Sequence, residues 1–262
     1  MDLDLTNKSA VVCGSTRGIG KAAALELAHL GAHVILVSRD EDALVRTQKE
    51  LPRSGTQHHD HIQADFAQPH VLKEKIGHYA GHHPPVHILV NNTGGPPGGP
   101  ITGAGSDEFV DVFSRHLLCN HILVQALLPG MKALHYGRII NVISISVKQP
   151  IAGLGVSNTV RGAVASWAKT LAGEVAPFGI TVNNILPGTT RTARLEWLMQ
   201  ERAKRQNASV ETVSEEMIAE VPAGRFGDPA DIANAIAFLA SPAASYINGI
   251  NLPVDGGRLA CL

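Results

Sequence analysis

The residues best suited to chemistry near the N-terminus form one glycine-rich run, Gly14-Ser15-Thr16-Arg17-Gly18-Ile19-Gly20. It follows a short apolar stretch at residues 9–13 and opens an amphipathic stretch at residues 18–30. Glycines let a backbone approach a pyrophosphate closely, and the N-terminus of the next helix offers free N–H groups. The spacing is Gly-x-x-x-Gly-x-Gly and not the common Gly-x-Gly-x-x-Gly. Because the run lies between a strand and a helix, we still predict a dinucleotide site and not a purely structural turn.

The second predicted strand ends at Ser38-Arg39. A site selective for NAD usually places a carboxylate there for the ribose hydroxyls, whereas an arginine suits a 2′-phosphate. Arg17 adds a second cation to the same region. The two arginines therefore favour NADP(H) over NAD(H). The alternative is that Arg39 is simply solvated and pairs with Asp40 or Glu41.

The elements that must position these residues alternate along the whole chain. Short apolar runs predict strands at residues 9–13, 33–38, 58–65, 87–91, 138–144, 180–186 and 250–254. Amphipathic runs predict helices at residues 18–30, 41–51, 71–79, 107–134, 157–176 and 229–240. Several strands are apolar throughout, which is typical of parallel strands covered on both faces. The alternation predicts one α/β domain over residues 1–262, a doubly wound Rossmann fold with a parallel seven-stranded sheet and helices on both faces.

Two features mark the starts of helices, and one segment interrupts the alternation. Asp107 and Asp228 occupy expected N-cap positions, with Pro229 at a first helical position.

Residues 190–221, between the sixth strand and the last helix, are charged and helical in pattern. Ligands of α/β sheets bind at the carboxyl ends of strands, so this insertion is predicted to be a helical lid. The plainer alternative is a surface excursion that only packs.

Composition limits the possible partners and compartments. The chain has 262 residues, 22 Lys and Arg against 23 Asp and Glu, and a net charge of −1, which argues against a nucleic-acid partner. Three scattered cysteines suit a reducing compartment, so we expect a cytoplasmic protein. The sequence lacks an apolar signal core and a long apolar run, so no membrane association is expected. The many histidines lack a helical pair with carboxylate support, so no metal site is expected.

Further motifs appear in a fixed order along the chain. They are the glycine motif, Ala64-Asp65, Asn91-Asn92-Thr93-Gly94, Gly137-Arg138-Ile139-Ile140-Asn141, Pro187-Gly188 with Thr192, Arg225-Phe226-Gly227-Asp228-Pro229 and Val254-Asp255-Gly256-Gly257. Together they resemble the classical type of the short-chain dehydrogenase/reductase family. Within that family they are most similar to the 3-oxoacyl-acyl-carrier-protein reductases. The resemblance covers the chain from Leu5 to Gly257.

The resemblance implies roles for residues outside the glycine motif. It implies that Asp65 and Phe66 contact the adenine, and that Asn92, Thr93 and Gly94 line the nucleotide. It places Pro187 and Gly188 beside the cofactor and implies that Thr190 and Thr192 hold the nicotinamide carboxamide. It also implies a small-molecule substrate. Finally, it implies a homotetramer or homodimer joined through the helices at residues 107–134 and 157–176.

The catalytic residues depart from the family pattern of Asn, Ser, Tyr and Lys. Ser144 matches the serine, but Ser157 stands at the tyrosine position, Arg161 at the lysine position and His116 at the asparagine position. Ser157 and Arg161 still share one helix face, because they are four residues apart, so both can reach the cofactor. Arg161 can keep the positive charge of the lysine and bond the ribose hydroxyls of the cofactor. A serine hydroxyl is a far weaker acid than a phenol, whose reference pKa is about 10. Arginine stays protonated and cannot act as the base.

Two residues are candidates to replace the missing proton carrier. His116 belongs to the type that titrates at a pKa of about 6.5 when unperturbed, and Lys148 follows Ser144 on the loop that borders the substrate pocket. The plainer alternatives are a histidine that only fills the asparagine site and an ordinary solvated lysine. The run Thr93-Gly94-Gly95-Pro96-Pro97-Gly98-Gly99-Pro100 is a second departure, expected to form a reshaped wall over the nicotinamide. It resembles a divergent branch of the family that also lacks the Tyr–Lys pair.

Two functions remain open at this point. The first is an NADP(H)-dependent oxidoreductase that acts on a carbonyl or secondary alcohol with an altered proton relay. The second is a dinucleotide-binding protein without dehydrogenase turnover, such as a sensor or an assembly partner. The complete nucleotide motifs fit both functions. The lost Tyr–Lys pair favours the second, whereas Ser144 and the predicted lid favour the first.

Overall fold

A computed structural model describes residues 1–96 and 98–261. Its strands form one parallel sheet in the order β3-β2-β1-β4-β5-β6-β7. The strands are β1 (Ser9–Cys13), β2 (His33–Ser38), β3 (Asp60–Gln63), β4 (Ile88–Asn91), β5 (Gly137–Val142), β6 (Ile180–Pro187) and β7 (Asn251–Val254). The order reverses direction between β1 and β4, so this is a doubly wound sheet whose ligand crevice lies beyond the carboxyl ends of β1 and β4. The predicted fold is confirmed.

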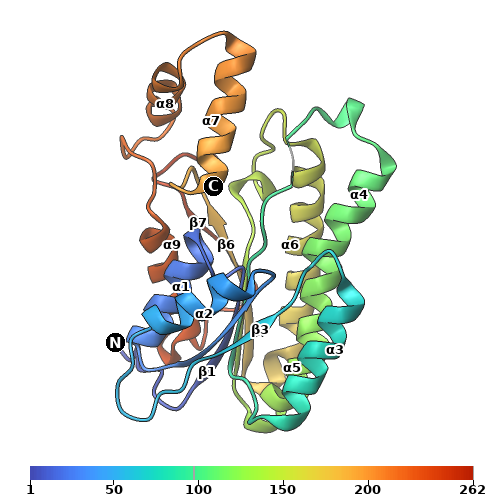
Figure 1. Ribbon diagram of the computed structural model, residues 1–262, viewed down its shortest axis with the longest axis vertical. Coiled ribbons are helices and arrows are strands. Elements are labelled where there is room, and N and C mark those ends of the chain that lie inside the picture. Colours follow the sequence, from blue (N-terminus) through green and yellow to red (C-terminus); the bar gives the residue numbers. More distant parts are fainter. Residues whose placement is uncertain (97, 262) are drawn as a thin grey trace.

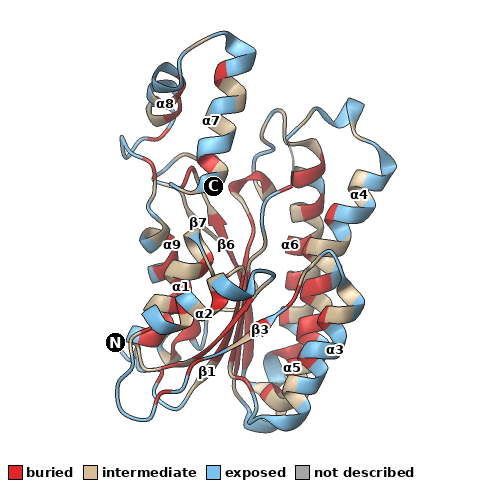
Figure 2. Ribbon diagram, in the orientation of Figure 1, coloured by how far each residue is buried: buried red, intermediate tan, exposed pale blue. Residues whose placement is uncertain are grey.

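Helices cover both faces of this sheet (Figure 1). They are α1 (Gly18–His29), α2 (Glu41–Glu50), α3 (Pro69–His82), α4 (Ser106–Phe113), α5 (Cys119–Leu134), α6 (Gly155–Val175), α7 (Ala193–Gln206), α8 (Val210–Ala219) and α9 (Pro229–Ala240). One core joins the sheet to α1 and α9, and the other joins it to α3, α5 and α6. Successive residues of β1 alternate between them, with Val12 in the first and Val11 in the second. The inner strands are therefore buried on both sides, as Figure 2 shows, whereas the edge strands β3 and β7 are partly exposed.

The long helix predicted at residues 107–134 is interrupted in the structure. One π-helical turn, Ser114–Leu118, separates α4 from α5 and contains His116. Such turns occur frequently at functional sites. The helix also begins one residue earlier than expected, at Ser106, because Gly105 is the N-cap and Asp107 lies in the first turn. The cap prediction for Asp107 is therefore wrong.

The other cap prediction is confirmed. Asp228 is the N-cap of α9 and Pro229 follows it in the first turn. The Asp231 carboxylate accepts a hydrogen bond from the Asp228 backbone N–H at 2.8 Å. This closes the N-terminus of α9 and fixes the segment that leads into it.

The third strand is shorter than the predicted 58–65. At its start the backbone N–H of His58 donates to the ring of His33, and the carbonyl of His59 accepts from the side chain of Gln48. Side chains thus take the hydrogen bonds that a neighbouring strand would have made, and the ladder begins at Asp60.

Within the described residues, one helical stretch is long and apolar enough to cross a membrane by length and composition, Ser106–Leu134. It also passes against the sheet, where Leu123, Leu127 and Met131 are buried in the core with α3 and α6. A core helix of a globular protein has the same composition and length.

Candidate functional site

The glycine run forms a turn of bare backbone between β1 and α1. Gly14 and Gly18 have φ angles of 58° and 54°, in the left-handed region that favours glycine. A Cβ atom at Gly20 would lie 2.2 Å from the Gly14 carbonyl oxygen, so no larger residue fits there. The Asn92 amide donates to the carbonyls of Cys13 at 3.2 Å and Gly14 at 3.4 Å and so ties β4 to the turn. The result is a cradle of the kind that a pyrophosphate occupies.

The N-terminus of α1 opens into this cradle. Arg17 is the N-cap of the helix and makes no side-chain capping bond. The first N–H groups of the helix, at Gly18, Ile19 and Gly20, are thus left for a ligand. Ser15 is fully buried beneath the turn, with its hydroxyl directed to the Val37 carbonyl at 3.4 Å.

Two arginines lie near the junction of β2 and the glycine turn, Arg39 directly after β2 and Arg17 in the turn itself. Ser38 Oγ lies 3.3 Å from Thr16 Oγ1, which joins the end of β2 to the glycine turn. The carboxylate of Asp40 instead caps α2 through the Ala43 N–H at 2.9 Å. Neither Arg17 nor Arg39 takes part in an ion pair within residues 1–96 and 98–261.

The second carboxylate that could neutralise Arg39 is also engaged elsewhere. Glu41 contacts the His61 ring, with Oε1 and Nε2 2.8 Å apart. Both exposed arginines beside the turn therefore remain available for an anion, and the alternative pairing of Arg39 with Asp40 or Glu41 does not form.

The segments after β3 and β4 lie at the same edge of the sheet. Asp65 and Phe66 follow β3 and are half-buried, and Asp65 Oδ1 accepts from the Ala67 N–H at 2.9 Å. Thr93 and Gly94 follow β4, which pairs directly with β1. The carboxyl ends of these parallel strands bring all four positions to the same edge of the sheet as the crevice.

The segment after β6 reaches the glycine turn from the other side. Pro187 ends β6, and a Cβ at Gly188 would lie 2.7 Å from the Asp255 backbone. Thr192 is the N-cap of α7, and its methyl group lies 3.2 Å from where a Cβ of Gly18 would stand. Thr190 is buried, with its hydroxyl donating to the Gly188 carbonyl at 3.2 Å. The predicted threonines thus border the same crevice as the glycine turn.

A second group of residues meets at the carboxyl end of β5. Ser144 caps a single 3₁₀ turn, Ile145–Val147, and its Oγ accepts from the Ser146 N–H at 3.1 Å. Arg161 Nη1 donates to the carbonyls of Val142 at 3.2 Å and Ile143 at 2.8 Å. This pins one face of α6 against the end of β5, directly before Ser144. Ser157, one turn earlier on that face, is 7% exposed.

His116 is buried at the neighbouring strand end. Its Nδ1 lies 2.6 Å from Thr93 Oγ1, and its ring also bonds to the backbone of Gly94. Burial, followed by the positive charges of Arg161 and Arg115, lowers the pKa of His116 to about 3. The imidazole is therefore neutral near pH 7, and the expected titration near 6.5 does not apply.

The remaining candidate groups lie at the margin or outside this cluster. Lys148 is half-buried at the end of the 3₁₀ turn, and its side chain makes no ion pair or hydrogen bond with the described residues. Of the tyrosines, Tyr79 in α3 stacks on His83 at the end of that helix, the Tyr136 hydroxyl donates to the Ala240 carbonyl, and Tyr246 is fully exposed. None of these phenols lies with the serines at the end of β5.

The structure adds one residue to which sequence reasoning gave no role. Arg194, in the first turn of α7, donates from Nη2 to the Pro96 carbonyl and lies over the Trp197 ring at 4.6 Å. Burial together with the charge of Arg194 lowers the pKa of Arg161 to about 10. Only the fold brings these two arginines together, because they are 33 positions apart in the sequence (194 − 161).

The glycine- and proline-rich run borders this cluster as a wall. Gly99 pairs with Leu154 in an isolated parallel bridge, with bonds from Gly99 N–H to the Gly153 carbonyl and from Gly155 N–H to the Gly99 carbonyl. These bonds hold the run against the chain that enters α6. Pro97 lies outside the described residues.

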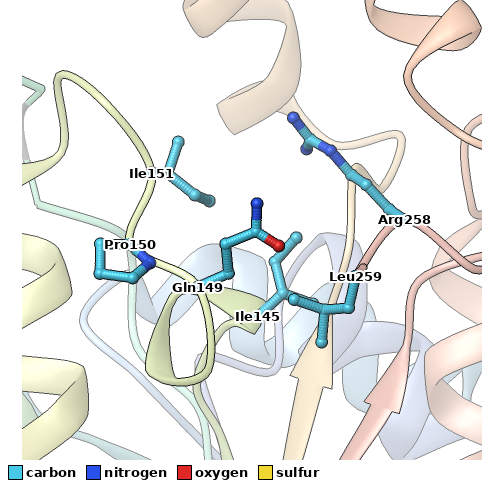
Figure 3. A pocket seen from close by; sticks show the side chains of 6 residues that line it. All are labelled: Ile145, Gln149, Pro150, Ile151, Arg258 and Leu259. Carbon is cyan, nitrogen blue, oxygen red and sulfur yellow. The ribbon is translucent and has the colours of Figure 1, made fainter. Parts of the chain in front are cut away.

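A cavity of about 140 Å³ lies beside the Ser144 loop. Figure 3 shows Gln149 in the middle of the group, with Arg258 across from Ile151. The lining residues are Ile145, Gln149, Pro150, Ile151, Arg258 and Leu259. Arg258 also donates to Thr189 and Glu220 and so joins the cavity to the base of the 190–221 segment. Among the residues described, no group of three His, Cys, Asp or Glu side chains is placed to hold a metal.

Comparisons with known proteins agree with this geometry. Residues 14–258 match the family model described as enoyl-(acyl carrier protein) reductase. The 3-oxoacyl-[acyl-carrier-protein] reductase FabG of Vibrio cholerae is 36% identical over 97% of this chain and 98% of its own length.

Solved structures show the same arrangement. The L-sorbose reductase of Gluconobacter frateurii, complexed with NADPH and L-sorbose, superposes with a TM-score of 0.93 at 32% identity over all of both chains. A 3-oxoacyl reductase of Agrobacterium tumefaciens C58 with NADP bound has a TM-score of 0.86 at 26% identity, covering 97% of this chain and 95% of that one. With the fold and the ordered motifs, these matches show that the chain belongs to the short-chain dehydrogenase/reductase family of oxidoreductase enzymes, in its classical type similar to the 3-oxoacyl-acyl-carrier-protein reductases.

Proposed function

We propose that the protein is an NADP(H)-dependent oxidoreductase that transfers a hydride to or from a carbonyl or secondary alcohol of a small molecule. The observation that carries the cofactor assignment is the pair of unpaired arginines, Arg17 and Arg39, beside the bare glycine turn. A dianionic 2′-phosphate fits two free guanidinium groups, whereas NAD has no charge to place there. Two similar structures were solved with NADPH or NADP, which supports the choice.

The residues of the crevice fit such a cofactor along its length. The glycine turn and the start of α1 would hold the pyrophosphate, and Asp65 with Phe66 would border the adenine. Thr190 and Thr192 would border the nicotinamide. The bound cofactor supplies the hydride, and the remaining chemistry depends on the residues at the end of β5.

We assign the substrate oxygen to the hydroxyl groups of Ser144 and Ser157. They lie at the end of β5 and on the facing side of α6, with Arg161 between the helix and the strand end. A hydroxyl can donate a hydrogen bond to developing negative charge on a carbonyl oxygen without giving up its proton. Arg161 remains protonated near pH 7 and supplies positive charge where the resembled family has a lysine.

The proton itself needs a carrier other than His116. A buried imidazole whose pKa is about 3 is neutral near pH 7 and therefore cannot act as a general acid there. We propose that His116 instead positions Thr93 and the Gly94 backbone under the nicotinamide. The proton then reaches the substrate oxygen from Lys148 or from water at the mouth of the site. Lys148 lies four positions after Ser144, and its amino group contacts none of the described residues through a hydrogen bond or an ion pair.

One observation favours the second function, dinucleotide binding without turnover. No phenol lies at the end of β5, and the Arg161 Nη1 atom is directed to two backbone carbonyls. The test is NADPH consumption over a panel of ketones, aldehydes and 3-oxoacyl thioesters, with wild type beside Ser157→Tyr/Arg161→Lys. Turnover by the wild type supports the enzyme. Turnover by the double variant alone would show a binding protein that has lost its reductase chemistry.

We propose that residues 190–221 form a lid over this site. Helices α7 and α8 stand beyond the sheet in Figure 1. They pack on each other through a separate small core, with Leu195, Val213 and Met217 among its buried members. A unit with its own core can move as a body while Arg194 and Thr192 stay attached to it.

We further propose a homotetramer or homodimer in a reducing cytoplasm. Val110, Phe113 and Leu118 are exposed on α4 and the π turn, at 68%, 46% and 42%. Exposed apolar residues on the outer side of a long helix favour an interface with a second copy of this chain. Static light scattering that reports a monomer would refute this assembly.

A further inference from the structure

Two arginines of the site, Arg161 and Arg194, have no carboxylate partner in the part of the chain that the structure describes. Neither Arg161 nor Arg194 forms an ion pair with the residues that the structure describes. The acidic residues near them on α7 do not compensate: Glu201 pairs with Lys204, and Glu196 is exposed. Most buried guanidinium groups are paired, so an unpaired couple is unusual.

The hydrogen bonds of the two arginines leave most of their donors unused. Arg161 makes both of its bonds from Nη1, to the carbonyls of Val142 and Ile143. Arg194 makes its bond from Nη2, to the Pro96 carbonyl. A guanidinium carries five N–H donors, so each group keeps an edge that bonds to no described residue.

The described residues around the two arginines add positive charge, and no described carboxylate acts on either guanidinium group. Arg194 lies close enough to Arg161 for its charge to disfavour protonation of that group. Arg205 on the same helix has Nη1 3.7 Å from where a Cβ of Gly153 would stand, on the rim of the same wall. His116 is neutral and cannot offset these charges. Two desolvated like charges raise the free energy of the site until an anion joins them.

We propose that the substrate carries an oxyanion group, a carboxylate or a phosphate, which binds between Arg161 and Arg194 while its reacting oxygen faces Ser144 and Ser157. This inference rests on the proposed function, since it names the substrate class of that same site. The planar forks of two guanidinium groups match an oxyanion in a bidentate manner. Because Arg194 belongs to α7, the anion would also join the lid to the body of the protein.

A rival occupant is a phosphate of the cofactor itself. Thr192, two positions before Arg194, contacts the glycine turn at Gly18. A pyrophosphate bound at that turn would therefore lie near the start of α7. The Arg194 side chain, however, is directed to Gly95 and Pro96, on the wall beside α6. Measuring oxyanion binding to protein already saturated with NADP⁺ separates the two occupants.

The experiment titrates oxalate, and separately inorganic phosphate, into NADP⁺-saturated protein by isothermal titration calorimetry. We compare wild type with Arg194→Gln, Arg194→Lys and the matched control Lys204→Gln, an exposed cation on the same helix. Saturable binding is expected in wild type and in the control. Losing one charge-assisted contact should weaken it roughly 10- to 100-fold in Arg194→Gln, with a smaller loss in Arg194→Lys.

Several outcomes would overturn the inference while leaving the proposed function in place. They are no saturable oxyanion binding, equal binding in Arg194→Gln and wild type, or, in a parallel titration of cofactor-free protein, binding that is seen only when NADP⁺ is absent. A protein that fails to bind NADP⁺ at all, followed by NADPH fluorescence, would overturn both proposals. Folding of each variant is checked by circular dichroism and by its NADPH affinity, which Arg194→Gln should leave within a few-fold of wild type.

Discussion

His116 Nδ1 lies 2.6 Å from Thr93 Oγ1, so the π-helical turn Ser114–Leu118 is joined to the loop that follows β4. The ring sits inside the protein with Arg161 and Arg115 nearby. In this position the imidazole stabilises a wall of the crevice in its neutral form. The pair therefore defines the shape of the site more than its proton chemistry.

The neutral imidazole predicts how stability depends on pH. The pKa of His116 is about 3 in the folded protein and near 6.5 when unfolded, so the unfolded chain binds the extra proton first. The contribution is complete above the unfolded value and is lost as pH falls from 6.5 toward 3. His116→Asn should remove roughly 2 kcal/mol of the stability difference between pH 7 and pH 5.

Urea unfolding at both pH values measures this effect, with His29→Asn as a control because that ring is exposed. Comparing variants cancels the other buried histidines, among them His87, whose pKa burial lowers to about 4. An unchanged pH dependence in His116→Asn would contradict a neutral buried ring.

The glycine turn predicts a steric effect on cofactor binding. A Cβ at Gly20 would meet the Gly14 carbonyl oxygen, and the backbone would have to move. We expect Gly20→Ala to cost roughly 1–3 kcal/mol of stability and to weaken NADPH binding at least about tenfold. The control is Gly77→Ala in α3, where an added Cβ meets no atom within 4 Å. NADPH fluorescence titration gives the affinity, and equal affinities for the two variants would refute the cradle.

The end of β2 predicts the cofactor preference. Arg39→Gln should weaken NADPH binding roughly 10- to 100-fold, because a charge-assisted contact to the 2′-phosphate is lost. NADH binding should not change, since NADH has no phosphate at that position. The control is Arg46→Gln, an exposed arginine on α2. Parallel loss of both affinities in Arg39→Gln would mean that Arg39 only supports the fold.

The serine at the end of β5 predicts a separation between binding and turnover. Ser144→Ala removes a hydroxyl that we assign to the substrate oxygen, and kcat should fall roughly 100-fold or more. NADPH affinity should remain at the wild-type value. Stopped-flow measurement of NADPH oxidation under single-turnover conditions gives the rate. A rate equal to wild type would remove Ser144 from the catalytic group.

The sheet and most of the nucleotide site could be predicted from the sequence, because local patterns encode them. Apolar strands such as residues 33–38 need cover on both faces, and Asp228 with Pro229 marks a helix start through local hydrogen bonding. The glycine turn is equally local, since its left-handed residues exclude side chains.

The features that were missed depend on contacts between distant segments. The start of β3 is set by hydrogen bonds between the backbone there and the side chains of His33 and Gln48. The alternation of apolar and polar residues within the strand does not reveal these bonds. The π turn around His116 keeps the same apolar stripe as an α-helix, so periodicity did not reveal it. Arg194 reaches the site because the fold places α7 beside the segment after β4, where Arg194 bonds to the Pro96 carbonyl. Sequence patterns do not reveal this contact.

The central claim is hydride transfer by this chain, and isotope transfer tests it most directly. NADPH carrying deuterium at the reactive C4 position of the nicotinamide is incubated with the panel of carbonyl compounds, and the products are analysed by mass spectrometry. With wild-type protein, we expect one deuterium on the carbon that bears the new hydroxyl group. The panel also includes 2-oxo acids, which Arg161 and Arg194 favour. Tight NADPH binding with no deuterated product from any of these compounds would contradict hydride transfer by this chain.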